Sequence, residues 1–210
     1  MGDPRVMNTP VTECGEDLID VRLTADLALG DLKVDESGDH AHLRRGLVNR
    51  LGDAQTLLPD GFRLLLVEGF RPAHLQRLYF DGYRQQLIDD DPGLDPAESF
   101  RLASRYVSPP EIAPHVSGAA IDLTLTGPQG EDVDMGTAIN ATPEASDGAC
   151  YFAAENITAE ARHHRQILAD ALSRAGLVNY PTEWWHWSFG DRYWAHVTHQ
   201  PAALYGPASR

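Results

Sequence analysis

The segment Ala113-Pro-His-Val-Ser-Gly-Ala-Ala-Ile-Asp-Leu-Thr-Leu-Thr126 joins a turn to an apolar strand. Gly118 gives the backbone the freedom that a turn needs, and residues 118–126 favour a strand. Asp122 lies inside this apolar run, where an unpaired carboxylate would be costly. A metal ion would satisfy it. The segment therefore predicts that His115 and Asp122 meet at one metal site.

A second motif, Glu183-Trp-Trp-His186, follows some sixty residues later and supplies the remaining groups. Two imidazoles and one carboxylate suit Zn²⁺, and a catalytic zinc takes three protein ligands and keeps one position for water. We therefore expect one zinc per chain, bound by His115, Asp122 and His186 at the sheet. Glu183 is placed to act as the general base on that water.

The second motif has a plainer interpretation, which is aromatic packing beside an exposed charge. In a regular strand, positions three apart face opposite ways. Glu183 and His186 would then point apart unless strand twist or a bulge brings them together.

Composition limits the class of protein. The 210 residues, 42% hydrophobic and 23% charged, predict one soluble globular domain over residues 1–210. A net charge of -14 argues against a nucleic-acid partner. Cys14 and Cys150 are too few for a disulfide framework. No apolar run approaches membrane-spanning length, so we expect no membrane association and a cytoplasmic location.

Periodicity and turn signals predict an α+β fold, with a small antiparallel sheet and flanking helices. The region from residue 136 to residue 156 is expected to be a long irregular loop, of a length typical of functional loops. The predicted helices cover 40–58, 72–88, 96–106 and a segment from a cap at Asn156 or Thr158 to about Gly176. The predicted strands cover 17–23, 62–67, 118–126 and 183–189, with 193–197 as a partner strand.

Four stretches resemble the M15 zinc peptidases, in that family's order and over most of the chain. They are Glu68-Gly-Phe-Arg-Pro72, His115 to Leu125, Met135-Gly-Thr137 and Glu183-Trp-Trp-His186. The resemblance is greatest to the D-Ala-D-Ala dipeptidase branch. It implies the same three zinc ligands and the same base, Glu183.

Arg71 matches the arginine of the family's Gly-[Phe/Tyr]-Arg-Pro motif, which implies a role in polarising the scissile carbonyl. A hydrolase of this type needs a cation near the developing oxyanion. Arg71 also follows a predicted buried strand, at an element end where sites are often built. The alternative is a surface ion pair at a helix start.

The chain departs from the family where a dipeptidase holds the free amino terminus of its substrate with a serine, an acid and a tyrosine. The matching positions here are Ala113, Asn140 and Leu27. Ser117 and Trp185, within the two motifs, are also assigned to substrate binding. A buried ammonium needs a carboxylate or several acceptors. We therefore expect an N-acylated or longer substrate to be better than free D-Ala-D-Ala, unless another loop acid replaces the lost one, such as Asp134, Glu144 or Asp147.

The sequence thus predicts a zinc metallopeptidase that hydrolyses a small peptide or amide, with D-Ala-D-Ala dipeptidase as the family-level function. A carboxypeptidase, or an amidase for an N-blocked or non-peptide substrate, is one alternative. A non-catalytic metal-binding module is another, against which Glu183 argues because a structural zinc needs no base and prefers four protein ligands. The oligomeric state stays open.

Overall fold

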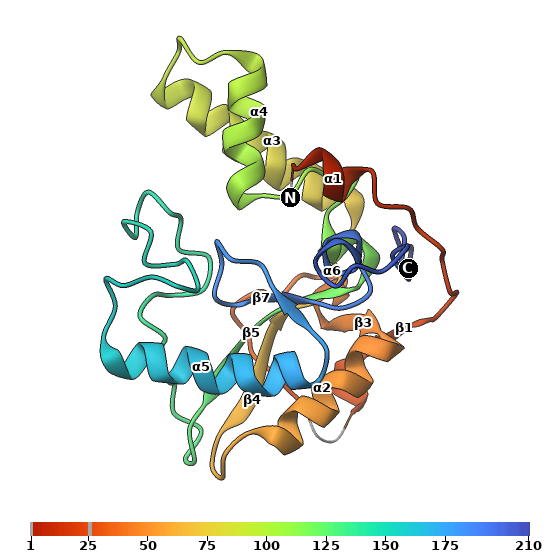
Figure 1. Cartoon of the computed structure of the whole chain (residues 1–210), viewed down its shortest axis with the longest axis vertical. Helices are drawn as coiled ribbons and strands as arrows, with labels where there is room; N and C mark the ends of the chain where they lie inside the picture. Colours follow the sequence, from red (N-terminus) through yellow and green to blue (C-terminus); the bar gives the residue numbers. More distant parts are fainter. Residues whose placement is uncertain (1, 25–26) are drawn as a thin grey trace.

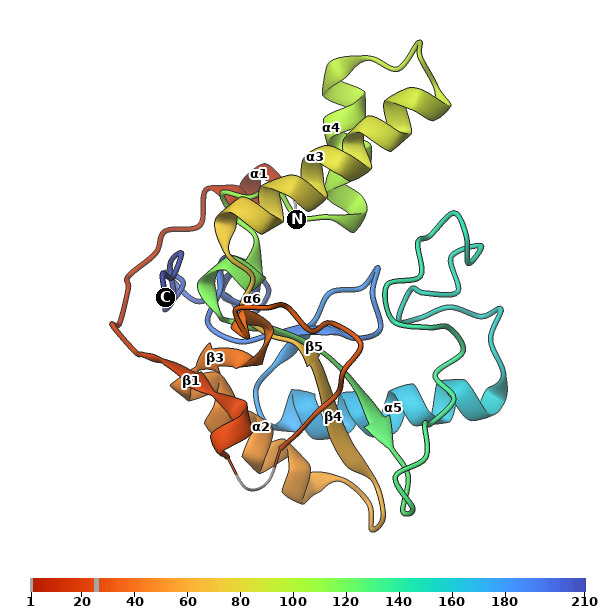
Figure 2. The same ribbon diagram turned by 180° about the vertical axis from the view of Figure 1, so that it is seen from behind.

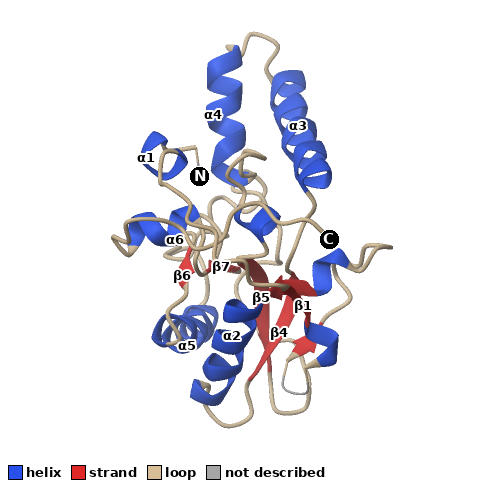
Figure 3. Ribbon diagram, turned by 90° about the vertical axis from the view of Figure 1, so that its right-hand side faces the viewer, coloured by secondary structure: helices blue, strands red, loops and turns tan. Residues whose placement is uncertain are grey.

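A five-stranded sheet with helices around it forms the centre of the computed structural model, which describes residues 2–24 and 27–210 (Figures 1 and 3). The strand order is β2-β4-β5-β7-β6. The predicted α+β class is therefore confirmed, while the extent of one domain over 1–210 stays a prediction. The strands of this sheet are β2 (Ala28–Leu29), β4 (Arg63–Glu68), β5 (Ala120–Thr126), β6 (Val178–Asn179) and β7 (His186–Ser188).

The two longest strands, β4 and β5, run antiparallel, with Leu64 opposite Leu125 and Leu66 opposite Leu123. Helices α2 (Arg45–Leu57) and α5 (Ala159–Arg174) lie side by side against the sheet (Figure 1). Their inward leucines and the strand leucines make one hydrophobic core. Burial of this apolar surface stabilises the sheet on which the site is built. The leucines are Leu47, Leu51, Leu64, Leu66, Leu123, Leu125, Leu168 and Leu172.

Thr158 caps α5 as predicted, since its side chain accepts a hydrogen bond from the Ala161 amide at 2.9 Å. Residues 127–158 contain turns and bends but no helix or regular strand, in agreement with the predicted loop. In Figure 2 this loop begins at the lower end of β5, away from the α3–α4 hairpin described below, and then rises beside the sheet before it enters α5.

The sheet differs from the prediction in being mixed. β2 pairs parallel with β4, and the other neighbours are antiparallel. A second, two-stranded sheet joins β1 (Leu18–Asp20) to β3 (His42–Arg44). The predicted helix over 40–58 is therefore too long at its start, because residues 39–41 form a 3-10 helix and residues 42–44 form β3. The hydrogen bonds to β1 override the helical spacing there.

The predicted partner strand at 193–197 is wrong, because Arg192–Val197 forms helix α6. Asp191 starts it, since its side chain accepts a hydrogen bond from the Trp194 amide at 2.7 Å. An aspartate N-cap favours a helix over the strand that Tyr193 and Trp194 suggest. β7 pairs instead with β5 and β6.

Two helices, α3 (Ala73–Asp90) and α4 (Pro96–Tyr106), form a hairpin that projects from the body of the molecule (Figures 1 and 2). Asp95 caps α4 by accepting a hydrogen bond from the Ala97 amide at 2.8 Å. Phe80 and Phe100 pack edge to face between the helices, with ring centroids 5.3 Å apart. The hairpin places aromatic side chains above the end of the sheet. A short helix, α1 (Pro4–Met7), lies against α6.

Within the described ranges, no helix has the length and apolar character that crossing a membrane requires.

Candidate active site

A cavity of about 230 Å³ lies between the central sheet and the α3–α4 hairpin. It contains the groups that the sequence singled out for chemistry, and it has cationic, acidic and aromatic walls. Its lining residues include Lys33, Arg71, Gln76, Tyr79, Tyr83, Tyr106, Ala113, His115, Asp122, Asn140, Tyr180, Glu183, Trp185 and His186.

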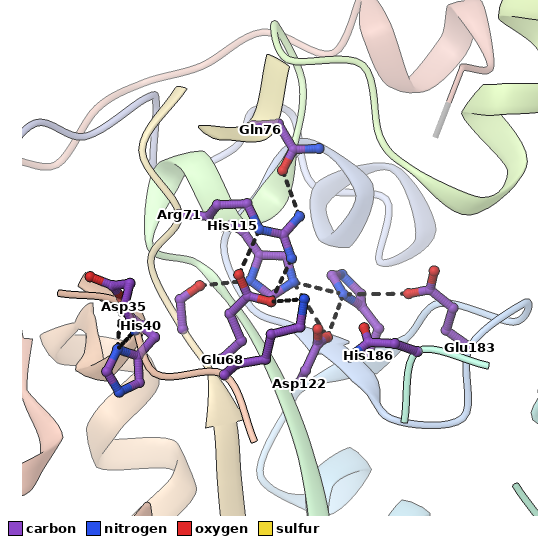
Figure 4. A network of polar contacts seen from close by, with 12 residues as sticks. Asp35, His40, Glu68, Arg71, Gln76, His115, Asp122, Glu183 and His186 are labelled. Carbon is purple, nitrogen blue, oxygen red and sulfur yellow. Dashed lines mark hydrogen bonds and ion pairs between the residues drawn. The ribbon is translucent and has the colours of Figure 1, made fainter. Parts of the chain in front are cut away.

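Three predicted metal ligands meet at this cavity (Figure 4). Asp122 on β5 lies directly opposite His186 on β7 in the sheet register. His115 comes from a 3-10 helix (Pro114–Ser117) that ends at Gly118, whose φ of 67° is left-handed. This conformation suits glycine and turns the chain from His115 into β5. The three ligand atoms lie within 4.8 Å of one another.

The potential metal-ligand atoms of these three residues lie close to one another. Asp122 Oδ1 is 3.0 Å from His186 Nδ1 and 3.3 Å from His115 Nε2. His115 Nε2 is 3.1 Å from His186 Nδ1. His115 Nδ1 lies 2.7 Å from the Gly69 carbonyl oxygen, which only accepts, so Nδ1 carries the proton and Nε2 presents a lone pair. Metal-ligating histidines typically have such a backbone partner on the second ring nitrogen. The group therefore fits a metal ion.

The electrostatics of the cluster favour the same protonation states. Burial opposes ionisation of Asp122, but the adjacent His115 and His186 hold the pKa of its carboxyl well below the ordinary value. Burial lowers the pKa of His186, which favours neutral imidazole. A carboxylate and neutral imidazoles are the forms that bind metal.

Glu183 lies beside the cluster, with its Oε2 3.8 Å from His186 Nδ1. Residues 183–185 form a turn that leads into β7, with the Glu183 amide donating to the Tyr180 carbonyl at 2.9 Å. Because this segment is not a regular strand, Glu183 and His186 reach the same cavity despite their three-residue separation. Burial, and next the negative charge of Asp122, raise the pKa of Glu183 well above its usual value. A raised pKa is typical of a carboxylate that acts as a general base.

Arg71 lines the other side of the cavity, directly after β4. Its Nε and Nη2 donate to the two carboxylate oxygens of Glu68, each at 2.7 Å, and its Nη1 donates to Gln76 Oε1 at 2.8 Å. These contacts use three of the five N–H groups of a guanidinium. Burial opposes the charge, but Glu68 raises the pKa of Arg71, so the guanidinium stays cationic. Arg71 is thus held in one position with donors left for a substrate oxygen.

Some of the predicted substrate-binding residues line the cavity and others do not. Ala113, Asn140 and Trp185 line the cavity. Ser117 does not line it, since its hydroxyl donates to the Pro114 carbonyl at 2.7 Å within the 3-10 helix and borders a separate, smaller hollow. Leu27 packs in the hydrophobic core.

The loop acids considered as replacements lie outside the cavity lining. Asp134 accepts a hydrogen bond from the Gly136 amide at 2.8 Å, and Glu144 accepts one from the Tyr83 hydroxyl at 3.2 Å. Asp147 is exposed. Among the described residues that line the cavity, Asp122 and Glu183 are the only carboxylates.

Several residues in or next to the cavity lining were not assigned a role from the sequence. Glu68 belongs to a quoted motif, and its position at the end of an apolar run, three residues before Arg71, was a usable signal. Tyr79 and Tyr83, four apart on α3, share a helix face. Tyr106 and Lys33 come from distant segments, so only the fold brings them to the cavity.

Comparison with known proteins identifies the family of the chain. The profile of the M15 peptidases, described as D-Ala-D-Ala dipeptidase, matches residues 47–202. A D-alanyl-D-alanine dipeptidase from Synechocystis sp. (strain ATCC 27184 / PCC 6803 / Kazusa) is 28% identical, with 94% of each chain covered.

Solved structures with a similar chain path include the LdcB LD-carboxypeptidase and VanYB in complex with D-Ala-D-Ala. LdcB has a TM-score of 0.49 and 16% identity over 90% of this chain and 74% of the other. VanYB has a TM-score of 0.44 and 17% identity over 87% of this chain and 88% of the other. Because the family profile covers well over half of the 210 residues, this chain belongs to the M15 peptidase family and is a peptidase.

Proposed function

We propose that this peptidase is a zinc-dependent hydrolase that cleaves the peptide bond of D-Ala-D-Ala or of a closely related peptide. The observation that carries the proposal is the convergence of His115, Asp122 and His186 in one cavity with Glu183 and Arg71. The names of the family and of the Synechocystis relative support D-Ala-D-Ala as the substrate class. A cytoplasmic location is part of the proposal.

The ligand set fits zinc because two imidazoles and a carboxylate leave a position open to water or substrate. When bound, zinc would supply Lewis-acid activation of the attacking water and of the scissile carbonyl. Glu183 takes the proton from the attacking water and passes it to the leaving amine. Arg71, fixed by Glu68 and Gln76, donates to the carbonyl oxygen as negative charge develops there.

The amino end of the substrate is the point at which this chain differs from a dipeptidase. Ala113 and Asn140 line the cavity. We propose that they occupy the positions from which a dipeptidase supplies hydrogen bonds and negative charge to the substrate ammonium. An asparagine oxygen accepts a hydrogen bond but does not neutralise charge. We therefore propose that an N-acylated dipeptide, or a longer peptide, is preferred over free D-Ala-D-Ala.

The experiment compares kcat/KM of the zinc-loaded protein for D-Ala-D-Ala and N-acetyl-D-Ala-D-Ala. We expect release of D-Ala, with the acetylated peptide favoured. Preference for the free amine would restore an ordinary dipeptidase. The carboxypeptidase or amidase alternative gains from the same cavity lining, since either would act on a blocked amino end. The non-catalytic alternative would be supported if neither peptide is cleaved while zinc is bound.

A further inference from the structure

Lys33 is the one lysine in the 210-residue sequence, since the other sixteen cationic side chains are arginines. It lies in the segment that follows β2, and it lines the cavity together with Arg71, His115 and Glu183. Neither the predicted zinc chemistry nor the base accounts for a second cation at this position.

The contacts of Lys33 are loose. Its Nζ is 3.9 Å from Glu68 Oε2 and 5.1 Å from the centre of the Tyr79 ring, and its side chain keeps 30% of its exposure. Glu68 already binds Arg71 through both oxygens at 2.7 Å. Arg71 thus pairs with the charge of Glu68 at a much shorter distance than Lys33 does. The ammonium of Lys33 is therefore available to bind another partner.

The other acidic side chains nearby already have partners or a proposed catalytic role. Asp122 is held by the two histidines of the metal cluster, and Glu183 is the proposed base. Asp35, two residues after Lys33, accepts hydrogen bonds from the His40 amide and ring, each at 2.7 Å. Among the described residues, Lys33 is therefore a lining cation with no carboxylate within hydrogen-bonding distance, whereas a free amino terminus would require an available carboxylate at this position.

We propose that Lys33 binds a carboxylate of the substrate beside the scissile bond. The inference rests on the proposed hydrolase function and names the substrate class, which is a peptide carrying a carboxylate and no free ammonium in the cavity. The carboxylate is either the C-terminal α-carboxylate or an acidic group on the amino side.

The choice of lysine fits this role. An arginine here would present a planar fork to Glu68 and compete with Arg71 for both carboxylate oxygens. A lysine ammonium is a compact charge on a flexible stem. Lys33 can therefore leave Glu68 at 3.9 Å and approach a substrate carboxylate without disturbing the Arg71–Glu68 pair.

The single lysine permits a direct binding experiment. Reductive methylation with ¹³C-formaldehyde labels Lys33 and the chain's amino terminus only, and it keeps the charge. The zinc-loaded Glu183→Ala protein, labelled in this way, is titrated with N-acetyl-D-Ala-D-Ala, its C-terminal amide, and N-succinyl-D-Ala-D-Ala amide. We expect a peptide that carries the recognised carboxylate to shift the Lys33 resonance, and the neutral acetyl amide not to shift it.

The three peptides separate the two sources of the carboxylate. A shift with the acetylated free acid assigns the α-carboxylate, and a shift with the succinyl amide assigns an acidic group on the amino side. No shift with either acid, or equal shifts with the neutral amide, would overturn the proposal.

A matched pair of variants gives the second measurement. Lys33→Met should weaken calorimetric binding of the recognised acid by about tenfold or more, with little effect on the neutral amide. Arg77→Met removes a charge from the exposed face of α3, where Arg77 faces Glu111 at 3.5 Å, and should leave both affinities unchanged. Equal losses for acid and amide in Lys33→Met would indicate a structural role and refute carboxylate binding.

Measurements of binding and of turnover distinguish failure of the carboxylate site from failure of the proposed function. If the acid binds in a Lys33-dependent way but is never cleaved by the protein with Glu183 intact, the proposed function fails and the carboxylate site stands. If the acid is cleaved and Lys33→Met leaves KM unchanged, the proposed function stands and the carboxylate site fails.

Discussion

The two walls of the cavity are built differently. The sheet wall, made by Arg71, His115, Asp122 and His186, comes from strand ends and a 3-10 helix, and Glu68 holds Arg71 from outside the lining; all five residues are buried. Its polar groups hold one another through contacts of 2.7–3.3 Å. A wall of this kind fixes reacting groups in one geometry.

The tyrosine wall, made by Tyr79, Tyr83, Tyr106 and Asn140, comes from the projecting hairpin and the long loop. The Tyr106 hydroxyl donates to the Asn140 carbonyl at 2.6 Å, and the Tyr83 and Tyr106 rings are 5.1 Å apart. Burial raises the pKa of Tyr83 to about 12, so its hydroxyl stays protonated. This wall is aromatic and neutral.

The contrast predicts that chemistry and recognition are separable here. The sheet wall matches the family motifs residue by residue, whereas Ala113 and Asn140 depart from the family at positions that we propose to recognise the amino end. Changes in the sheet wall should therefore abolish catalysis for every substrate, and changes opposite it should alter which substrate is used.

The largest effect is expected from removing a metal ligand. His186→Ala should lose bound zinc and all measurable peptidase activity, because two ligands remain of three. Zinc content by atomic emission, with activity on N-acetyl-D-Ala-D-Ala, is the measurement. The exposed His199→Ala is the control and should retain both. Full zinc occupancy in His186→Ala would remove this residue from the ligand set.

Glu183→Ala should keep zinc and lose activity by about 10²–10⁴-fold, the usual contribution of a general base. The carboxylate lies 3.8 Å from His186 but is not needed to complete the ligand set. Zinc content and kcat are measured on the same preparation. Loss of zinc in this variant would instead place Glu183 among the ligands.

Arg71→Ala should lower kcat by about 10²–10³-fold with a smaller change in KM, because oxyanion charge appears mainly in the transition state. Steady-state kinetics over a range of substrate concentrations separates the two constants. If only KM rises, Arg71 binds the substrate in its ground state, and the sheet wall shares the task of recognition.

Substituting both positions at which the chain departs from the family tests recognition of the substrate's amino end. Ala113→Ser with Asn140→Asp should raise kcat/KM for free D-Ala-D-Ala by about tenfold, because a carboxylate and a hydroxyl then face the ammonium. Asn140 has a φ of 65°, which aspartate also tolerates. The ratio of kcat/KM values for the free and acetylated peptides is the measurement. An unchanged ratio would show that the amino end lies elsewhere.

The last prediction concerns stability and not activity, and it involves Asp191, whose buried Oδ2 has no hydrogen-bond partner among the described residues. Burial raises the pKa of Asp191 from 3.8 to about 6. The folded protein therefore holds this proton more tightly than the unfolded chain does. The stabilising contribution is complete below pH 3.8 and is lost as the pH rises through about 6.

Asp191→Asn removes this titration while keeping an acceptor for the Trp194 amide. Relative to wild type, the free energy of unfolding of the variant should improve by up to about 3 kcal/mol between pH 4 and 6, and stay constant above. Urea unfolding of metal-free protein in chelator is the measurement, so that metal binding does not contribute. Parallel pH profiles for the two proteins would contradict the raised pKa.

The sequence alone determined most of the elements and the choice of the groups that we propose to react. The apolar runs at β4 and β5, the cap at Thr158 and the proline starts of the hairpin are local signals, since each depends on neighbouring residues. The two motifs carried the metal-site hypothesis because the residue types themselves specify the chemistry. Local signals failed where a distant partner decided the outcome. His42–Arg44 is a strand because β1 pairs with it.

Only the tertiary structure decided what faces the reacting groups. Lys33 and Glu68 are 35 positions apart, and Tyr106 meets the Asn140 carbonyl across 34 positions. No spacing rule links such residues, because their proximity depends on how strands pair and where the hairpin packs. The structure likewise placed Leu27 in the core and kept Ser117 out of the cavity. Short sequence motifs indicate the chemistry, because the residue types themselves carry it. Substrate recognition depends on contacts between distant segments, which only the fold creates.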